Sequence, residues 1–226
     1  MQAAEEQDKV VRFYDQFAEK QEKTGINSRH LSILDKVKKA GLQAQHRILE
    51  VGCGIGTVSH LLATQVPQGE VLAVDISPES IEKARVLWKK QGNLKFDVSD
   101  MSDFNLPGKT FDFFVFPDVL EHIPDDTKAM KELYRVLKPG GMAILQIPQD
   151  LNRTTTFSDD SITDEKERAR IFGQYDHVRI YGLDYFDKLR SVGFTVVEED
   201  YTKKISPELV TKYCLAPGEI IPVCFK

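Results

Sequence analysis

Three closely spaced glycines, Gly52, Gly54 and Gly56, follow an apolar run and lie between two carboxylates, Glu50 and Asp75. A glycine loop lets the backbone approach a ligand closely, with its N–H groups directed at that ligand. Asp75 ends the next apolar run, 23 residues after Gly52. A carboxylate at such a strand end can accept hydrogen bonds from a ribose diol. Together these residues predict a pocket for a ligand that contains a nucleoside.

The spacing of the glycines narrows the choice of ligand, because it departs from the dinucleotide-binding pattern G-x-G-x-x-G. With Glu50 included, the segment reads E-x-G-x-G-x-G, which resembles the first motif of the class I S-adenosylmethionine-dependent methyltransferases. Later segments resemble their counterparts in small-molecule and tailoring members of this family and occur in the same order. They are residues 71–75, 97–101, 111–123 and 133–145. The resemblance is strong over about residues 45–148 and looser on the flanks.

The resemblance implies S-adenosylmethionine as cofactor. Gly52 and Gly54 would approach its methionine portion, while Glu50 orients the loop. Asp75 would accept from both ribose hydroxyls, with a strand-end helix cap as the structural alternative. Residues that would contact the adenine or the cofactor's amino group are Ile76 (adenine face), Asp100 (adenine amino group, with Asp97 as competitor), Met101 (backbone N–H), and Pro117 and Asp118 (backbone carbonyls).

Methyl transfer from an activated donor depends above all on the alignment of the acceptor, the methyl group and the sulfur. A hydroxyl or ammonium acceptor must also lose a proton, whereas a carboxylate has none to lose. His122 is the one side chain of the segment 117–123 suited to take a proton near neutral pH. The alternative is that the Glu121-His122 pair is structural, with His122 contacting the cofactor or capping the next helix.

A second group of candidates is Tyr175, His177, Arg179 and Tyr181. Strand alternation would put the last three on one face. Arg179 could clamp an acidic acceptor, His177 could act as the base, and the two tyrosines could line the acceptor site. A surface strand edge is the competing interpretation.

The elements that must position these residues alternate along the chain. Strands are expected near 47–51, 70–75, 94–98, 111–116 and 141–147, and helices near 57–66, 78–91 and 126–137. This order predicts an α/β fold with a doubly wound, mostly parallel sheet that binds ligands beyond the carboxyl ends of its strands. A helix near 183–192 and strands near 193–197 and 220–225 resemble the end of the family's seven-stranded, Rossmann-like sheet, including its final antiparallel pair.

The flanks of this core are expected to complete one domain over residues 1–226. Residues 1–44 contain two helical runs, which form a lid over the cofactor or simply pack on the sheet. Tyr14 or Phe17 would contact the cofactor, as a tyrosine does in similar enzymes. Residues 45–148 form the cofactor-binding core, 149–178 a polar insertion on the substrate side after strand five, and 179–226 the C-terminal strands and helix.

Composition limits the possible partners. The formal net charge of −5 argues against a nucleic-acid surface. No apolar run reaches membrane-spanning length, and the acidic N-terminus has no signal-peptide core. We therefore expect a cytoplasmic protein. Its three cysteines, Cys53, Cys214 and Cys224, lack metal-ligand spacing and are expected to be reduced thiols, with a Cys214–Cys224 bridge as the alternative. No metal site is expected.

The predicted activity is methyl transfer to a small molecule or biosynthetic intermediate, with a hydroxyl or carboxylate oxygen favoured as acceptor. Strand four lacks the Asn/Asp-Pro-Pro-Tyr ending used for planar amines, which argues against nucleic-acid bases and glutamine. N-methylation and carboxyl methylation of a tailored peptide stay open. The competing classes are a nicotinamide-dependent oxidoreductase and an inactive nucleoside-binding regulator. Oligomeric state is not indicated by the sequence.

Overall fold

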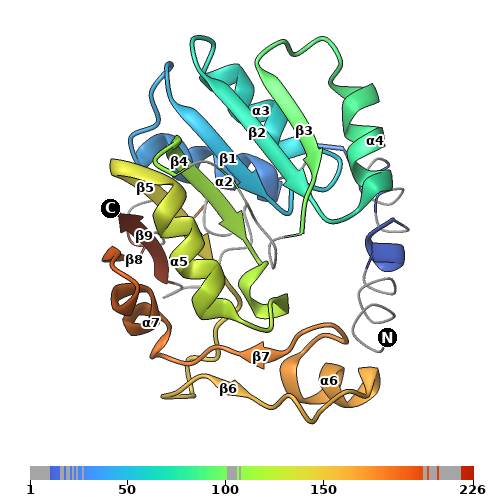
Figure 1. Cartoon of the computed structure of the whole chain (residues 1–226), viewed down its shortest axis with the longest axis vertical. Helices are drawn as coiled ribbons and strands as arrows, with labels where there is room; N and C mark the ends of the chain where they lie inside the picture. The colour runs from blue at the N-terminus through green and yellow to red at the C-terminus, as the bar shows by residue number, and fades with distance from the viewer. Residues whose placement is uncertain are drawn as a thin grey trace.

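The sequence folds around one mixed sheet, as the computed structural model of the chain shows (Figure 1). The structure describes residues 11–15, 18, 21, 23, 25–26, 28–100, 106, 108–200, 203, 208 and 220–226. The seven strands of the sheet are ordered β3-β2-β1-β4-β5-β9-β8. Their bounds are β1 Arg47–Val51, β2 Glu70–Asp75, β3 Leu94–Val98, β4 Phe111–Pro117, β5 Leu137–Gln146, β8 Thr195–Asp200 and β9 Ile220–Phe225.

Parallel pairing joins β3, β2, β1, β4 and β5, and β9 runs antiparallel to both β5 and β8. The expected doubly wound, mostly parallel seven-stranded sheet with a final antiparallel pair is therefore confirmed. The order reverses between β1 and β4, where open α/β sheets bind their ligands.

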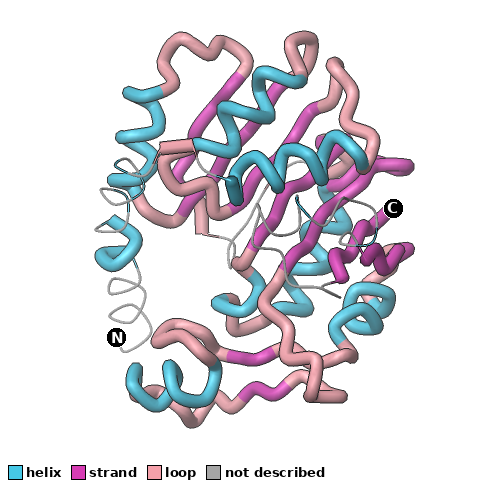
Figure 2. The backbone as a smooth tube through the Cα atoms, turned by 180° about the vertical axis from the view of Figure 1, so that it is seen from behind, coloured by secondary structure: helices cyan, strands magenta, loops and turns pink. Residues whose placement is uncertain are grey.

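Both faces of the sheet are covered because adjacent residues of its central strands are apolar and point to opposite sides. Ile48 and Phe113 pack on one face with helices α2 (Ser28–Lys39) and α3 (Thr57–Gln65). Leu49 and Phe114 pack on the other face with α5 (Asp126–Val136) and α7 (Tyr185–Ser191). Helix α4 (Pro78–Leu87) contacts β2 and β3. Figure 1 presents the α5 face, and Figure 2 shows α2 and α3 across the opposite one.

Two expected boundaries differ from the structure. The helix expected over 78–91 ends at Leu87, and the ring N–H of the next residue, Trp88, donates to the carbonyl of Ile55. The chain enters β5 at Leu137, before residue 141, where this strand was expected to start. Leu137 pairs with Phe111, and the register shifts before Phe113 pairs with Met142. Gly140, at φ 77°, lies within this irregular stretch.

The segment after β5 forms a structured arm rather than a plain loop. It contains a two-stranded sheet of β6 (Phe157–Ser158) and β7 (Arg179–Ile180), with α6 (Glu165–Phe172) between them in sequence. In Figure 1 this arm lies beyond the carboxyl ends of the large sheet, next to the short 3₁₀ helix η2 (Leu120–His122). The arm thus lies at the edge of the sheet where we expected the insertion on the substrate side.

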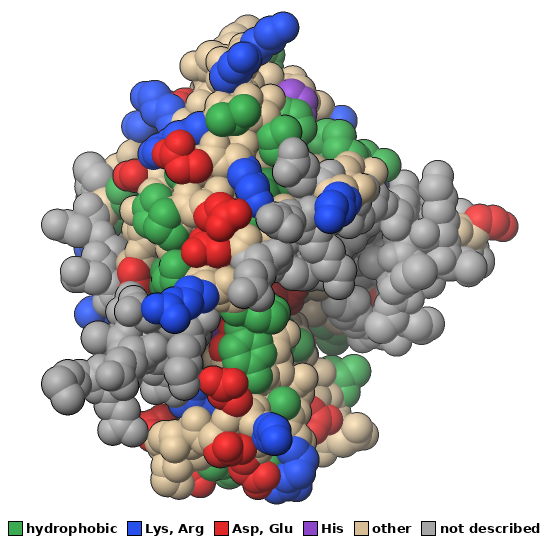
Figure 3. Space-filling view, turned by 90° about the vertical axis from the view of Figure 1, so that its right-hand side faces the viewer, with side chains coloured by type: hydrophobic (Ala, Val, Ile, Leu, Met, Phe, Trp, Pro, Cys, Tyr) green, Lys and Arg blue, Asp and Glu red, His purple; other side chains and the backbone are tan. Residues whose placement is uncertain are grey.

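Charge and thiol chemistry match the limits set by composition. On the face shown in Figure 3, Lys and Arg side chains are interspersed with Asp and Glu among the described residues. No helix in the described ranges has both the length and the apolar character needed to cross a membrane. Cys53 and Cys224 are buried free thiols, and burial raises the pKa of Cys224 to about 12. Cys214 lies outside the described residues.

Candidate functional site

The glycine loop connects β1 to α3 at the carboxyl end of the sheet. Gly52 and Gly54 have φ values of 73° and 53°, a left-handed region that side chains other than glycine rarely adopt. A Cβ on Gly52 would lie 2.8 Å from Cγ2 of Val119, so the loop and the segment after β4 are in direct contact. A Cβ on Gly54 would enter the space taken by the side chain of Gln21.

The N–H groups of the loop are less available than the sequence suggested. Those of Gly52 and Cys53 donate to the carbonyl of Val74, at 2.9 and 3.1 Å. The N–H of Gly54 donates to Oδ2 of Asp75 at 2.7 Å. These bonds prolong the β1–β2 pairing into the loop, so the loop offers a close approach rather than a set of free donors. The N–H of Ile55 donates to a side-chain oxygen, Oε1 of Gln21.

Asp75 ends β2 and is buried beside the loop. Its Oδ1 accepts from the N–H of Ser77, the N-cap residue of α4, at 2.9 Å, so the carboxylate holds the start of α4 as well as Gly54. Burial raises the pKa of Asp75, and the backbone donors oppose that shift. Each carboxylate oxygen has two lone-pair directions, so the backbone bonds leave acceptor capacity for a ligand.

Glu50 lies beneath the loop in β1 and is buried. Its Oε2 accepts a 2.5 Å hydrogen bond from the hydroxyl of Ser59 in α3. Burial raises its pKa to about 8, against the lowering effect of the Ser59 bond. The side chain joins the strand before the loop to the helix after it, consistent with the expected orienting role.

The residues expected at the adenine end lie next to Asp75. The N–H of Ser99 donates to the carbonyl of Asp75 at 2.9 Å, which brings the end of β3 to the end of β2. Ile76 and Asp100 are half-buried, whereas Asp97 is exposed, so burial favours Asp100 over its competitor. Met101 lies outside the described residues.

The end of β4 has an unusual backbone. Pro117 pairs with Gln146, and the N–H of Asp118 donates to the carbonyl of that glutamine at 2.9 Å. Asp118 has a φ of 52°, which costs free energy in a residue with a side chain and is typical of functional sites. This turn sends the chain from β4 past Gly52 into η2.

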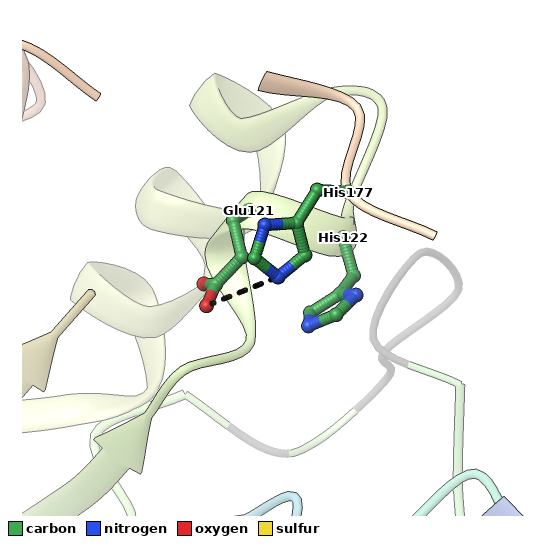
Figure 4. Close-up of side chains that lie close together, drawn as sticks. All are labelled: Glu121, His122 and His177. Carbon is green, nitrogen blue, oxygen red and sulfur yellow. Dashed lines mark ion pairs between the residues drawn. The ribbon is translucent and has the colours of Figure 1, made fainter. Parts of the chain in front are cut away.

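A buried group of carboxylates and imidazoles follows that turn. Glu121 and His122 come from η2, and His177 comes from the segment leading into β7; Figure 4 shows the three side chains converging. The two imidazole centroids are 4.6 Å apart. His122 Nδ1 lies 3.2 Å from Oδ2 of Asp176, and His177 Nε2 lies 4.0 Å from Oε1 of Glu121.

Burial and neighbouring charges shift the pKa values of the two imidazoles of this group in opposite directions. Burial would lower the pKa of His122, but its contact with Asp176 and the charges of Asp176 and Glu121 outweigh burial, so the pKa is raised. Burial and the neighbouring His122 lower the pKa of His177. Burial raises the pKa of Glu121 to about 7. The site thus holds two imidazoles of different proton affinity side by side.

Comparison with known proteins agrees with this geometry. Residues 48–141 match the family model described as a methyltransferase domain. This stretch is a class I S-adenosylmethionine-dependent methyltransferase domain. It contains the loop, Asp75, the turn after β4, Glu121 and His122.

Two curated relatives and one solved structure illustrate the likeness. An uncharacterised methyltransferase of Schizosaccharomyces pombe is 40% identical over 103 residues, covering 42% of this chain and 37% of the relative. The malonyl-[acyl-carrier protein] O-methyltransferase 1 of Ilyobacter polytropus is 30% identical over 128 residues, covering 57% and 45%. The chain therefore spans less than half the length of these two curated relatives.

The phosphoethanolamine N-methyltransferase 2 of Haemonchus contortus, solved with S-adenosyl-L-methionine, shares the fold. It has a TM-score of 0.62 and 20% identity, and the alignment covers 86% of this chain and 52% of that one.

The N-terminal residues touch both ends of the methyltransferase domain's site. The Ser77 hydroxyl donates to Oδ1 of Asp15 at 2.5 Å, beside the cofactor loop. The Tyr14 hydroxyl donates to Oδ2 of Asp176 at 3.2 Å, on the arm. The aromatic ring of Phe13 lies 4.8 Å from that of Tyr175. Tyr14, expected at the cofactor, is thus bonded to the arm, and Phe17 is outside the described residues.

Arg179 and Tyr181 hold the arm against the methyltransferase domain. The guanidinium of Arg179 is buried and donates to the carbonyls of Leu120, Ile123 and Pro124. The hydroxyl of Tyr181 donates to Oδ2 of Asp126 at 2.9 Å. His177, Arg179 and Tyr181 are buried and the residues between them are half-buried, although only Arg179 and Ile180 form the strand β7. These contacts favour a positioning role over a substrate clamp.

Three residues of the candidate site were given no role in the sequence predictions: Gln21, whose side chain contacts the loop, Glu121 and Asp176. Glu121 was noted in its motif without a site role. Asp176 immediately precedes His177, and this Asp-His pair was the available signal. Gln21 had none, because its contact with the loop spans 34 residues of sequence.

Proposed function

We propose that this chain transfers a methyl group from S-adenosylmethionine to a hydroxyl of a small molecule. One observation carries the proposal: the cofactor loop and the imidazole–carboxylate group are adjacent. Val119 contacts Gly52 of the loop, and Glu121 and His122 follow Val119 closely in sequence. A methyl donor on the loop side and an acceptor on the arm side would meet at the end of β4. The O-methyltransferase named among the relatives and the N-methyltransferase among the structural neighbours indicate how widely acceptors vary.

The loop side suits the cofactor. When bound, S-adenosylmethionine supplies a methyl group on a positively charged sulfur, and S-adenosylhomocysteine leaves. We expect Asp75 to hold the ribose diol with the lone pairs that its backbone bonds do not use. Ile76, Asp100 and Met101 would hold the adenine. Gly52 and Gly54 give the close approach that the methionine portion needs, next to the backbone of Pro117 and Asp118.

The arm side suits an acceptor that must lose a proton. A carboxylate acceptor would need no base and would be repelled by the carboxylates of Glu121 and Asp176. Two imidazoles next to these acids instead favour removal of a proton from a hydroxyl, with His122 and His177 as the residues in reach. Tyr175, next to Asp176 in sequence, would line the acceptor side, and Arg179 and Tyr181 would position the arm.

Calorimetric titration of the purified chain with S-adenosylmethionine, S-adenosylhomocysteine and NADH tests the cofactor. We expect saturable binding of the first two alone, lost in Asp75→Asn because the amide replaces the charged acceptor. Asp187→Asn is the matched control, since Asp187 is exposed and pairs with Arg190 on the surface. Binding of NADH alone would support an oxidoreductase instead.

A labelled-methyl screen of hydroxyl, amine and carboxyl compounds then tests the acceptor. Label in hydroxyl compounds supports the proposal. Label only in amines or only in carboxylates overturns the hydroxyl assignment while keeping the cofactor. Cofactor binding without transfer to any class would favour a nucleoside-binding regulator.

A further inference from the structure

Glu121, His122 and His177 place one carboxylate and two imidazoles around a common point (Figure 4). One possible ligand atom from each lies within 4.8 Å of those from the other two. We propose that these three side chains bind one divalent transition-metal ion. Neither cysteine spacing nor a sequence motif indicated this site, because His177 lies 55 residues beyond His122 and the arm brings it back.

Glu121 provides the strongest independent support. The residue is 1% exposed, and both carboxylate oxygens are buried without a hydrogen-bond partner among the described residues. A buried charge with no partner is costly, and a coordinated cation removes that cost. A cation held between the three side chains would satisfy both of these carboxylate oxygens.

The two imidazoles are oriented as metal ligands are. His177 Nδ1 lies 3.1 Å from the carbonyl oxygen of Phe172. Because a carbonyl only accepts, Nδ1 carries the proton and Nε2 keeps its lone pair. His122 Nδ1 lies 3.2 Å from Oδ2 of Asp176, at ion-pair distance from this buried carboxylate. Metal-bound histidines commonly donate their second ring N–H to a carbonyl or carboxylate, which fixes the ring and its tautomer.

The donor set indicates which ions would bind. Two imidazole nitrogens and one carboxylate suit zinc, iron, cobalt or manganese, whereas magnesium and calcium prefer oxygen ligands alone. Ligand atoms about 2.1 Å from one ion lie roughly 3 to 3.5 Å apart. The three side chains would therefore move together by roughly 1 Å, within the reach of side-chain rotations. Three protein ligands leave at least one position open for another molecule.

The open position would serve the acceptor, and this role, unlike the metal site itself, rests on the proposed methyl transfer. A hydroxyl bound to the ion would have a lowered pKa and release its proton to water. His122 and His177 would then act as ligands that replace a general base. Arg179, through its bonds to Leu120, Ile123 and Pro124, would keep the arm and η2 in register.

The site is tested on the full chain after removal of metals with a chelator. Titration calorimetry with Zn²⁺, Mn²⁺ and Mg²⁺ measures affinity and stoichiometry, and the visible absorption of bound Co²⁺ reports nitrogen and oxygen ligands. We expect one Zn²⁺ or Mn²⁺ per chain and much weaker Mg²⁺. Glu121→Gln and His177→Asn should each weaken Zn²⁺ binding by at least about 100-fold, more than the 10–100-fold typical of outer-shell changes.

His46→Asn is the matched control, because His46 lies in a turn before β1 and accepts from the N–H of Gln43; it should leave binding unchanged. No saturable binding, or equal binding by Glu121→Gln and the unmodified chain, would overturn the site. If a ligand variant fails to fold, Asp176→Asn replaces it, with an expected loss of about 10–100-fold. S-adenosylmethionine binding without metal binding would refute this inference alone, and the reverse result would refute the proposed cofactor alone.

Discussion

Burial of Glu50 should make the stability of this protein fall as pH rises. Its pKa is about 8 in the folded chain, against a usual value of 4.5. The folded state therefore holds a proton that the unfolded state loses between these two values. The stability contributed by that proton is complete below pH 4.5 and disappears as pH rises through 8. Since one pKa unit corresponds to about 1.4 kcal/mol, the full effect is about 5 kcal/mol.

Glu50→Gln isolates this effect, because glutamine cannot ionise and its side-chain oxygen can still accept from Ser59. The variant should match the unmodified chain near pH 5 and exceed its stability by up to about 5 kcal/mol at pH 8.5. At about 2–4 °C per kcal/mol, the melting temperatures would differ by about 10–20 °C.

Thermal unfolding followed by the fluorescence of Trp88 would measure this difference. Trp88 is the single tryptophan of the chain, and its ring N–H donates to the carbonyl of Ile55 in the loop. Glu82→Gln is the control: Glu82 is 71% exposed, so the same substitution there should change the melting temperature far less than Glu50→Gln does. A gap between Glu50→Gln and the unmodified chain that stays constant from pH 5 to pH 8.5 would refute the reasoning.

Two further predictions concern packing around the site. Gly52→Ala should destabilise the chain by about 1–3 kcal/mol and weaken S-adenosylmethionine binding, because φ is 73° and the new Cβ would lie 2.8 Å from Cγ2 of Val119. The melting temperature measures the first effect and calorimetry the second. Unchanged values of both would contradict the expected strain. Tyr181→Phe should cost about 1–3 kcal/mol in urea unfolding, because it leaves a buried oxygen of Asp126 without its hydroxyl donor; the prediction is wrong if the variant unfolds at the urea concentration of the unmodified chain.

The core of the fold was predictable because its signals are local. The central parallel strands contain short apolar runs, such as Phe113 to Phe116, since both faces of the sheet are buried there. Asp75 was predictable for the same reason, as a carboxylate directly after such a run. The early end of α4 was not, because it coincides with the bond from Trp88 to Ile55, 33 residues away.

The acceptor side was predicted only as a set of residue types. His177 and Arg179 were recognised as chemically capable. The carbonyls that Arg179 binds, and the side chains of Glu121 and His122 that face His177, lie 55 residues or more away in sequence. Strand alternation indicated that His177 and Arg179 share a face without indicating what that face meets. This face packs against the backbone carbonyls around η2. The guanidinium of Arg179, which was expected to bind a substrate, therefore donates its hydrogen bonds to the protein itself.

The division between these two sides explains why the family likeness stops short of the acceptor. The matched stretch, residues 48–141, holds the loop, Asp75 and Glu121, whereas Asp176 and His177 come from the arm beyond it. Cofactor binding and arm chemistry therefore depend on separate parts of the chain that meet around η2 and the start of α5. Asp75→Asn should consequently abolish S-adenosylmethionine binding and leave Zn²⁺ binding intact, while His177→Asn should do the reverse. A variant on either side that lost both ligands without unfolding would show that the two sides form one coupled site.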